Sequence, residues 1–395
     1  MIVKYIDQIE LSGKKVFIRA DLNVPFDDSG AISDDNRIQA SVPTIRYALD
    51  HGAKVIVASH LGRPKGRDMS QSLAPVARRL QEILGVPVTL GEDCVGEAVE
   101  KQAQALQPKQ VLLLENLRFH KEEEKNDPAF AQSLAKLCEV YVNDAFATAH
   151  RAHASTEGMV KLVPVAAGGF TLKSEVEYFN KAFAQPERPF VAVFGGAKVS
   201  DKIKAIKNVG SRANRIVVGG AMANTFFAAE GLSVGKSLHE PEQLETARAT
   251  KKFLAEKNCE LVLPVDVVVA PELKAGSPKK VVDVSAIPAD QMALDIGPKS
   301  VELFKNAFAD AKTIIWNGPM GAFETPDFAA GTYGIVDALA ASQALTVVGG
   351  GDTDVALHQR HAFEKMSYVS TAGGAFLCLL EGSPLPAVEA LENKR

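Results

Sequence analysis

Short apolar runs alternate with amphipathic segments of helix length along the whole of this 395-residue chain. The runs have the length and the β-branched composition of strands. They are Val16–Ala20, Lys54–Ser59, Val111–Leu114, Tyr141–Asn143, Phe190–Phe194, Arg215–Val218, Leu261–Val265, Thr313–Trp316 and Leu345–Val348. Several are apolar at successive positions, as expected for parallel strands buried on both faces. The alternation predicts an α/β fold of doubly wound parallel sheets.

So many strands favour two domains over one very large sheet, and 395 residues with 46% hydrophobic content can bury two or three cores. Ser41-Val-Pro43 is expected to open a helix that stops before Gly52, and Ser72 to open one that stops at Gly85. The domain boundary is expected near Val163–Lys173, followed by a hinge helix over Leu172–Phe183. These signals predict one domain over 1–170 and a second from 171 onwards.

Bulk properties exclude several classes of protein. A net charge of −4 gives no global field for nucleic acid or an acidic membrane. We find no secretory signal at the N-terminus and no apolar run near the ~18 residues that span a bilayer. The cysteines Cys94, Cys138, Cys259 and Cys378 are scattered without a Cys-x-x-Cys pair. We therefore expect a soluble cytoplasmic protein with no disulfide framework and no structural zinc site.

Polar and cationic residues follow the strands of the first half, where open α/β sheets bind their ligands. The first strand runs into Asp21-Leu-Asn23 and a loop with Arg37, and the second into His60-Leu-Gly-Arg63. The later two run into segments that carry Arg118 and Arg151. One such arginine is usually a solvated surface residue, but four post-strand loops together favour a site. The pattern predicts a small ligand with several negative charges and with hydroxyls for Asp21 and Asn23.

Glycine-rich turns take the same place in the second half. They are Gly195-Gly-Ala-Lys198, Gly219-Gly-Ala-Met222, Asn317-Gly-Pro319, Gly349-Gly-Gly-Asp-Thr353 and Ala372-Gly373-Gly374. Glycine lets backbone N–H groups approach a phosphate, and a helix N-terminus adds partial positive charge. Lys198 and Lys202 are expected four apart on one face of a helix, reaching successive phosphates. Asp352 suits Mg²⁺, which takes one or two carboxylates plus phosphate oxygens.

Three other patterns carry less weight. Gly231-Leu-Ser-Val-Gly235-Lys236-Ser237 has only three residues between its glycines and follows a helical stretch, so we interpret it as a surface loop and not a P-loop. No G-x-G-x-x-G follows a strand, which counts against a dinucleotide-dependent dehydrogenase. His150 and His153 lack a third metal ligand at suitable spacing, and anion binding fits them better.

Seven segments together resemble the motifs of the phosphoglycerate kinase family, of the bacterial type. They are Asp21-Leu-Asn-Val-Pro25, His60-Leu-Gly-Arg-Pro64, Glu115-Asn-Leu-Arg-Phe119, Ala149-His-Arg-Ala-His153, Gly195-Gly-Ala-Lys198 with Asp201-Lys202, Trp316-Asn-Gly-Pro319 with Glu324, and Gly349-Gly-Gly-Asp-Thr353. They occur in order between residue 16 and about residue 382, nearly the whole chain. The resemblance implies two Rossmann-like domains, with a C-terminal tail over Leu385–Leu391 that returns to the first. The domains would then be 1–170 plus 380–395 for phosphoglycerate and 171–379 for nucleotide.

The resemblance also implies reversible phosphoryl transfer between 1,3-bisphosphoglycerate and ADP, giving 3-phosphoglycerate and ATP, in line and on domain closure. It implies Mg²⁺ as cofactor, a monomer and a glycolytic role. The implied substrate-binding residues are Asp21, Asn23, Arg37, His60, Arg63, Arg118 and Arg151. The implied nucleotide-binding residues are Gly195, Ala197, Lys198, Lys202, Gly219, Gly220, Leu294, Asn317, Pro319, Glu324, Gly349, Gly350, Gly351, Asp352 and Thr353, with Glu324 on the ribose and Asp352 on the metal. The groups that would neutralise the charge on the transferring phosphoryl group are Arg37, Lys198, Lys202, Gly373, Gly374 and Mg²⁺.

The chain departs from the family pattern at Ala221, Ala372 and Tyr368, where the family has glycine, glycine and often histidine, and at Leu172-Lys173-Ser174 near the hinge. A methyl group at Ala372 could narrow the approach to the transferring phosphate if it faces the site. A catalytically silent nucleotide-binding regulatory protein of the same fold is the alternative. Loss of Arg37, Lys198 or Asp352 would have favoured it, but all three are present.

Overall fold

The apolar runs of the first half form one six-stranded sheet in which every strand pairing is parallel. Its strand order is β3-β4-β2-β1-β5-β6. The strands are β1 (Lys15–Ala20), β2 (Lys54–Ala58), β3 (Val88–Leu90), β4 (Val111–Leu113), β5 (Val140–Asp144) and β6 (Val165–Gly168). The central strands β1, β2 and β5 are buried almost throughout, as a sheet covered on both faces requires.

A second six-stranded parallel sheet, in the order β15-β14-β13-β7-β8-β9, comes from the second half. Its strands are β7 (Phe190–Phe194), β8 (Arg215–Val218), β9 (Glu260–Val262), β13 (Thr313–Asn317), β14 (Leu345–Gly349) and β15 (Tyr368–Ser370). Between β9 and β13 in the sequence, the chain forms a three-stranded antiparallel sheet with the order β11-β10-β12. It consists of β10 (Asp266–Ala270), β11 (Lys280–Asp283) and β12 (Met292–Ile296).

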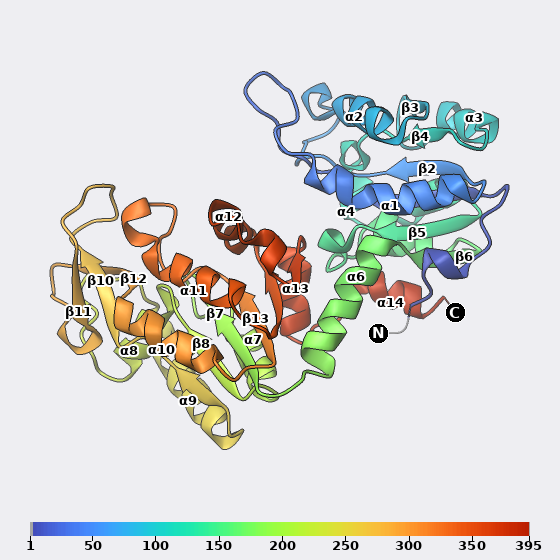
Figure 1. The fold of residues 1–395 in the computed structure, drawn as a ribbon. Helices are drawn as coiled ribbons and strands as arrows, with labels where there is room; N and C mark the ends of the chain where they lie inside the picture. The colour runs from blue at the N-terminus through green and yellow to red at the C-terminus, as the bar shows by residue number, and fades with distance from the viewer. Residues whose placement is uncertain (1–2, 395) are drawn as a thin grey trace. The chain divides into compact units, whose positions relative to one another are not determined.

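Helices cross over between the strands of both sheets (Figure 1). In the first half they are α1 (Asn36–Asp50), α2 (Ala74–Leu84), α3 (Glu97–Ala105), α4 (Lys121–Glu124) and α5 (Pro128–Ala135). The later ones are α6 (Phe170–Phe179), α7 (Ile203–Gly210), α8 (Met222–Ala229), α9 (Leu244–Glu256), α10 (Pro298–Phe308), α11 (Ala330–Ala340), α12 (Gly351–Gln359), α13 (Gly373–Leu380) and α14 (Pro386–Glu392). The predicted α/β fold with two doubly wound parallel sheets is confirmed.

The computed structural model describes residues 3–394, and these form two compact units. Unit 1 is the chain up to Glu177 together with the segment from Pro384, and unit 2 is Tyr178–Ser383. The chain passes from one unit to the other within α6. The C-terminal helix α14 belongs to unit 1, where the backbone N–H of Ala387 donates to the carbonyl of Ala149 at 3.2 Å. The predicted return of the C-terminal tail to the first domain is therefore confirmed.

One expected helix start was wrong, and the strand β6 was missed. The first helix begins at Asn36, not at Ser41, so Pro43 lies inside α1. Asp34 starts the helix by accepting the N–H of Asn36 at 2.7 Å, and this places Arg37 in the first helical turn instead of a loop. The stretch assigned to the domain boundary contains β6, which continues the first sheet beside β5. Over residues 3–394, no helix combines the length and the apolar character needed to cross a membrane.

Candidate functional site

Unit 1 carries a cluster of arginines at the carboxyl ends of β1, β2 and β4. Arg37, on the first turn of α1, forms an ion pair with Asp21, and its Nη1 lies 2.8 Å from Asp21 Oδ2. The Arg37 side chain is 39% exposed, so its guanidinium remains open to a ligand while Asp21 orients it. The structure therefore brings together two of the predicted substrate residues, which are 16 positions apart in the chain.

Asn23 and Arg118 are linked through one glycine turn. Asn23 Oδ1 accepts the N–H of Gly62 at 2.8 Å, and Arg118 Nη1 donates to the carbonyl of the same glycine at 2.8 Å. Gly62 has φ +62°, the left-handed conformation that favours glycine in this turn. Arg118 is buried, whereas Arg63, next to the turn, is exposed. Arg63 is therefore free of the packing constraints that hold Arg118.

A buried hydrogen-bond network beside this cluster was not predicted from the sequence. Arg19, on β1, is 1% exposed and donates from Nε to Ser155 Oγ at 2.8 Å. Ser155 in turn donates two hydrogen bonds to Glu123, from Oγ to Oε1 at 2.6 Å and from its backbone N–H to Oε2 at 2.9 Å. Burial raises the pKa of the fully buried Glu123. The one signal for Arg19 was a charged residue inside an otherwise apolar strand.

The histidines of the cluster are neutral near pH 7. Burial, followed by the charges of Arg19, Arg118 and Arg37, holds the pKa of His60 well below its usual value. Burial and Arg19 lower the pKa of His153 to about 3. His60 Nδ1 lies 3.3 Å from Arg19 Nη2, so the neutral ring can accept from the guanidinium. The positive charge of this cluster therefore resides on its arginines.

Arg151, the last predicted substrate residue, is half-buried and donates from Nε to Nε2 of His150 at 3.2 Å. Burial and the neighbouring Arg151 charge lower the pKa of His150. His150 therefore accepts a hydrogen bond from an arginine, and the anion-binding role of His150 and His153 stays a prediction.

Unit 2 contains a cavity of about 530 Å³ between its glycine turns and the antiparallel sheet. The predicted nucleotide residues that line it are Ala197, Gly220, Leu294, Pro319, Glu324 and Asp352. Apolar side chains of β12 and α8, among them Met292 and Phe227, form much of the remaining wall. A pocket that joins apolar walls to a few polar groups suits a planar ring with polar attachments.

The glycine turns beside this cavity are packed too closely for side chains. A Cβ at Gly220 would lie 2.7 Å from the backbone N and O of Gly196, and Gly220 has φ +69°. A Cβ at Gly219 would lie 2.5 Å from Met320 Sδ, and one at Gly195 would collide with the backbone of Gly318 and Pro319. These glycines therefore bring the ends of β7, β8 and β13 together as bare backbone. The departure at Ala221 lies on the cavity wall itself.

The two lysines after β7 do not share a helix face, contrary to the sequence-based expectation. Helix α7 begins at Ile203, so Lys202 is its N-cap residue and Lys198 lies in the preceding turn. Lys198 is exposed, whereas Lys202 is largely enclosed and donates to Asn317 Oδ1. Burial lowers the pKa of Lys202 to about 8, although Asp201 and Asp352 oppose the shift. The turn around Val199 replaces the expected first helical turn because two N–H groups, of Lys202 and Ile203, both donate to its carbonyl.

Asn317 and Thr353 connect the ends of β13 and β14. Asn317 Nδ2 donates to the carbonyl of Gly349 at 2.6 Å, and Thr353 Oγ1 accepts the N–H of Gly318 at 3.0 Å. Both side chains are buried, so their polar atoms serve the backbone of these two turns. Asn317 also accepts from Lys202, which joins three of the predicted nucleotide residues in one network.

Two helix N-termini meet at the end of β14. Helix α12 begins after Gly350, whose φ is +116°, and α13 begins at Gly373 with Gly374 in its first turn. A Cβ at Gly373 would lie 3.6 Å from Gly350 Cα, so the two helix starts are neighbours. The carboxylate of Asp352 is on the first turn of α12 and lines the cavity. N–H groups and partial positive charge from two helices converge here, which suits a phosphate.

Two departures from the family pattern have clear positions. Ala372 is only 1% exposed, so its methyl group is packed inside the unit. Tyr368 stacks on Tyr178, with ring centroids 4.4 Å apart. A further residue that the sequence reasoning missed is Asp295, on the cavity wall, where burial raises its pKa to about 7. Its oxygens accept the N–H groups of Gly331 and Ile296 at 2.7 and 2.9 Å.

Fold and site together define an α/β protein with an arginine cluster in one unit and a nucleotide-sized cavity in the other. Residues 6–383 match the family model for phosphoglycerate kinase. Phosphoglycerate kinases of Geobacter metallireducens and Solibacter usitatus are 53% and 56% identical, over 100% and 98% of this chain and 99% of each relative. The solved phosphoglycerate kinase of Coxiella burnetii has a TM-score of 0.92 at 43% identity, and that of Pyrococcus horikoshii 0.83 at 33%, each covering 99% of both chains. This chain belongs to the phosphoglycerate kinase family.

Proposed function

We propose that this chain catalyses reversible phosphoryl transfer between the acyl phosphate of 1,3-bisphosphoglycerate and ADP, giving 3-phosphoglycerate and ATP. The observation that carries the proposal is the separation of two anion sites of different chemistry. Unit 1 offers arginine side chains around neutral histidines, and unit 2 offers helix N-termini beside an apolar cavity. The full-length relatives named phosphoglycerate kinase favour an active enzyme over a silent binding protein.

In unit 1 the negatively charged groups of the phosphoglycerate bind to the arginines. Arg37, Arg63, Arg118 and Arg151 supply guanidinium groups, whose planar N–H forks match phosphate and carboxylate oxygens. Asp21 and Asn23 accept from the hydroxyl group of the glycerate. His60 stays neutral against Arg19, and so can accept or donate one hydrogen bond without adding charge.

In unit 2 the base of the nucleotide occupies the apolar end of the cavity, beside Leu294, and Glu324 accepts from the ribose. The phosphates extend toward the starts of α12 and α13, within reach of Lys198 and Lys202. The exposed carboxylate of Asp352 on the cavity wall fits Mg²⁺, which binds through one or two carboxylates plus phosphate oxygens. When bound, the ion supplies positive charge to the phosphate oxygens.

The nucleophile belongs to the substrates, a carboxylate in one direction and a nucleotide phosphate oxygen in the other. The protein therefore contributes position and charge neutralisation, without an activated serine or cysteine. We assign the neutralisation to Arg37, Lys198, Lys202 and the N–H groups of Gly373 and Gly374. Reacting atoms must come within about 3 Å, so we propose that α6 acts as a hinge and the units close around the ligands. We further propose that the chain acts as a monomer, since one chain supplies both sets of ligand-binding residues. The resemblance to the family supports the proposal that it is cytoplasmic.

Activity with 3-phosphoglycerate and Mg-ATP, read as acyl phosphate trapped with hydroxylamine, tests this proposal. We expect turnover by the wild type, and a kcat about 10²–10³ times lower for Arg37→Ala with little change in the KM for ATP. Arg46→Ala removes another arginine from α1, one that donates to the Ile83 carbonyl, and is the matched control that should keep its kcat. A folded wild type without turnover would instead support the silent binding protein.

A further inference from the structure

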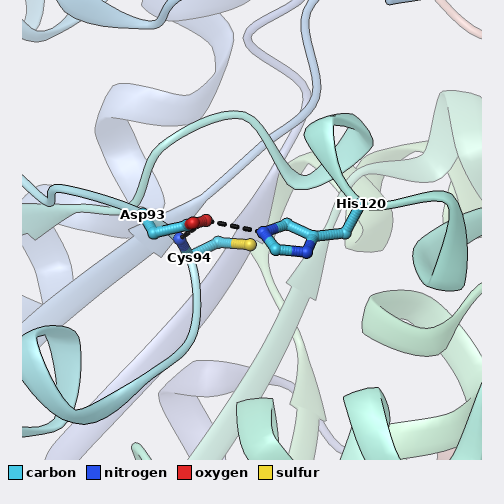
Figure 2. Close-up of side chains that lie close together, drawn as sticks. All are labelled: Asp93, Cys94 and His120. Atoms are coloured by element: carbon cyan, nitrogen blue, oxygen red, sulfur yellow. Dashed lines mark hydrogen bonds and ion pairs between the residues drawn. The ribbon is translucent and has the colours of Figure 1, made fainter. Parts of the chain in front are cut away.

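A compact cluster of three metal-ligating side chains lies in unit 1, apart from the residues assigned to the substrates. Asp93 and Cys94 follow β3, and His120 follows the helical turn Leu117–Phe119. Figure 2 shows the carboxylate of Asp93 and the thiol of Cys94 both directed toward the ring of His120. One ligand atom from each residue lies within 4.8 Å of the others. The sequence search for zinc ligands missed this group because Asp93 and His120 are 27 positions apart.

We propose that Asp93, Cys94 and His120 form a binding site for a borderline-soft divalent metal ion such as Zn²⁺. A carboxylate oxygen, a sulfur and an imidazole nitrogen are all zinc ligands, and a thiolate selects against Mg²⁺ and Ca²⁺. Three protein ligands leave a fourth tetrahedral position for water. The site is additional to the proposed kinase function and to the Mg²⁺ that accompanies the nucleotide.

The charges of the three ligands would balance the charge of the ion. Zn²⁺ with one thiolate, one carboxylate and a neutral imidazole has no net charge, so a partly buried site can hold it without an uncompensated ion. On binding, the thiol proton would leave to solvent. The proton between His120 Nε2 and Asp93 Oδ1, which lie 2.7 Å apart, would also leave a doubly protonated ring, so that His120 binds through Nε2 as a neutral imidazole with its remaining proton on Nδ1. The ion thereby replaces a contact already present between the two ligands.

Access and outer contacts also suit a bound ion. Cys94 is fully buried, but the side chains of Asp93 and His120 are 27% and 29% exposed and leave a path from solvent. Arg67 donates to the other oxygen of Asp93 at 3.1 Å and to the carbonyl of Glu92 at 2.6 Å. These hydrogen bonds hold the carboxylate in place, as residues that hydrogen-bond to metal ligands commonly do. His120 is two residues from Arg118, so the ion would fix the backbone beside a candidate substrate residue.

The test uses Co²⁺ as a spectroscopic probe on the full chain, after removal of metals with a chelator. We expect one Co²⁺ per chain, with a sulfur-to-cobalt charge-transfer band and the intense visible bands of four-coordinate Co²⁺, and displacement by Zn²⁺. His120→Gln preserves a donor for Asp93 but removes the nitrogen ligand, and Cys94→Ala removes the sulfur. Both variants should lose the charge-transfer band.

Cys138→Ala is the matched control, because Cys138 is another buried free cysteine of unit 1 and lies outside the cluster. It should retain the full spectrum. A wild type without the charge-transfer band overturns the proposal, even if the variants fold poorly. The proposal also fails if Cys94→Ala keeps the wild-type spectrum, since the bound metal would then lie elsewhere.

Discussion

At the scale of single residues, burial decides which groups carry charge. Lys202 donates to Asn317, and burial lowers its pKa to about 8, whereas Lys198 is exposed in the turn before α7. His60 and His153 lose their charge to burial and neighbouring arginines. The candidate site therefore depends on permanently charged arginines in unit 1 and on one titrating lysine in unit 2.

Lys202 predicts a pH dependence for nucleotide binding. Because the pKa of Lys202 is about 8, its side chain is mostly charged below pH 8 and mostly neutral above it. The affinity for Mg-ADP should therefore fall as pH rises from 7 to 9. Well above pH 8 the slope should approach about tenfold per pH unit. Lys202→Arg stays charged throughout this range and should remove this slope. Titration calorimetry at several pH values measures both, and an equal slope in the two proteins would contradict the assignment.

At the scale of elements, the N-terminus of α6 is fixed to unit 1 by two side chains. Asp144, at the end of β5, accepts the N–H and the Oγ–H of Thr171 at 2.8 and 3.2 Å. Thr44 Oγ1, on α1, accepts the N–H of Phe170 at 2.9 Å. Asp144 is only 1% exposed, and burial raises its pKa from 3.8 to about 6. The helix that links the units is thus anchored by a carboxyl group that resists ionisation.

This anchor predicts a pH dependence of stability. Because the pKa of Asp144 is higher in the folded chain, the folded state holds a proton between pH 4 and 6 that the unfolded state has released. The resulting stability is complete below pH 3.8 and disappears as pH rises through 6, a change of about 3 kcal/mol. As pH rises from 4 to 7, the free energy of unfolding of wild type should therefore fall relative to that of Asp144→Asn.

Urea denaturation between pH 4 and 7 measures the difference, and Asp50→Asn, at an exposed position on α1, controls for removing one carboxyl group. A constant difference between wild type and Asp144→Asn would show that Asp144 titrates alike in the folded and unfolded states.

Elements with a strong local pattern were predictable. Phe190–Phe194 and Arg215–Val218 are strands with the expected bounds, because their apolar runs fill buried central positions. The edge strands β3 and β15 were missed because they have only three residues each, and β11 was missed because it is largely exposed. Strand β10 was also missed, although Val267–Ala270 is an apolar run and most of the strand is buried. The glycine turns were predictable because each is local. The network of Arg19, Ser155 and Glu123 was not, because its members are up to 136 positions apart.

At the scale of the whole molecule, each unit contributes one kind of anion site. The arginine cluster belongs to unit 1, and the cavity with the starts of α12 and α13 belongs to unit 2. We propose that the arginine cluster binds phosphoglycerate and that the cavity of unit 2 binds the nucleotide. The two ligands should therefore bind to different units, and single substitutions should weaken one without the other.

The most direct test is calorimetric titration of each ligand alone into wild type, Arg63→Ala and Lys198→Ala. Both side chains are exposed, so neither substitution should disturb folding. We expect Arg63→Ala to weaken 3-phosphoglycerate binding by about 10–100-fold and to leave Mg-ATP binding unchanged, with the reverse for Lys198→Ala. If either substitution weakens both ligands by the same factor, the division of the two substrates between the two units is wrong.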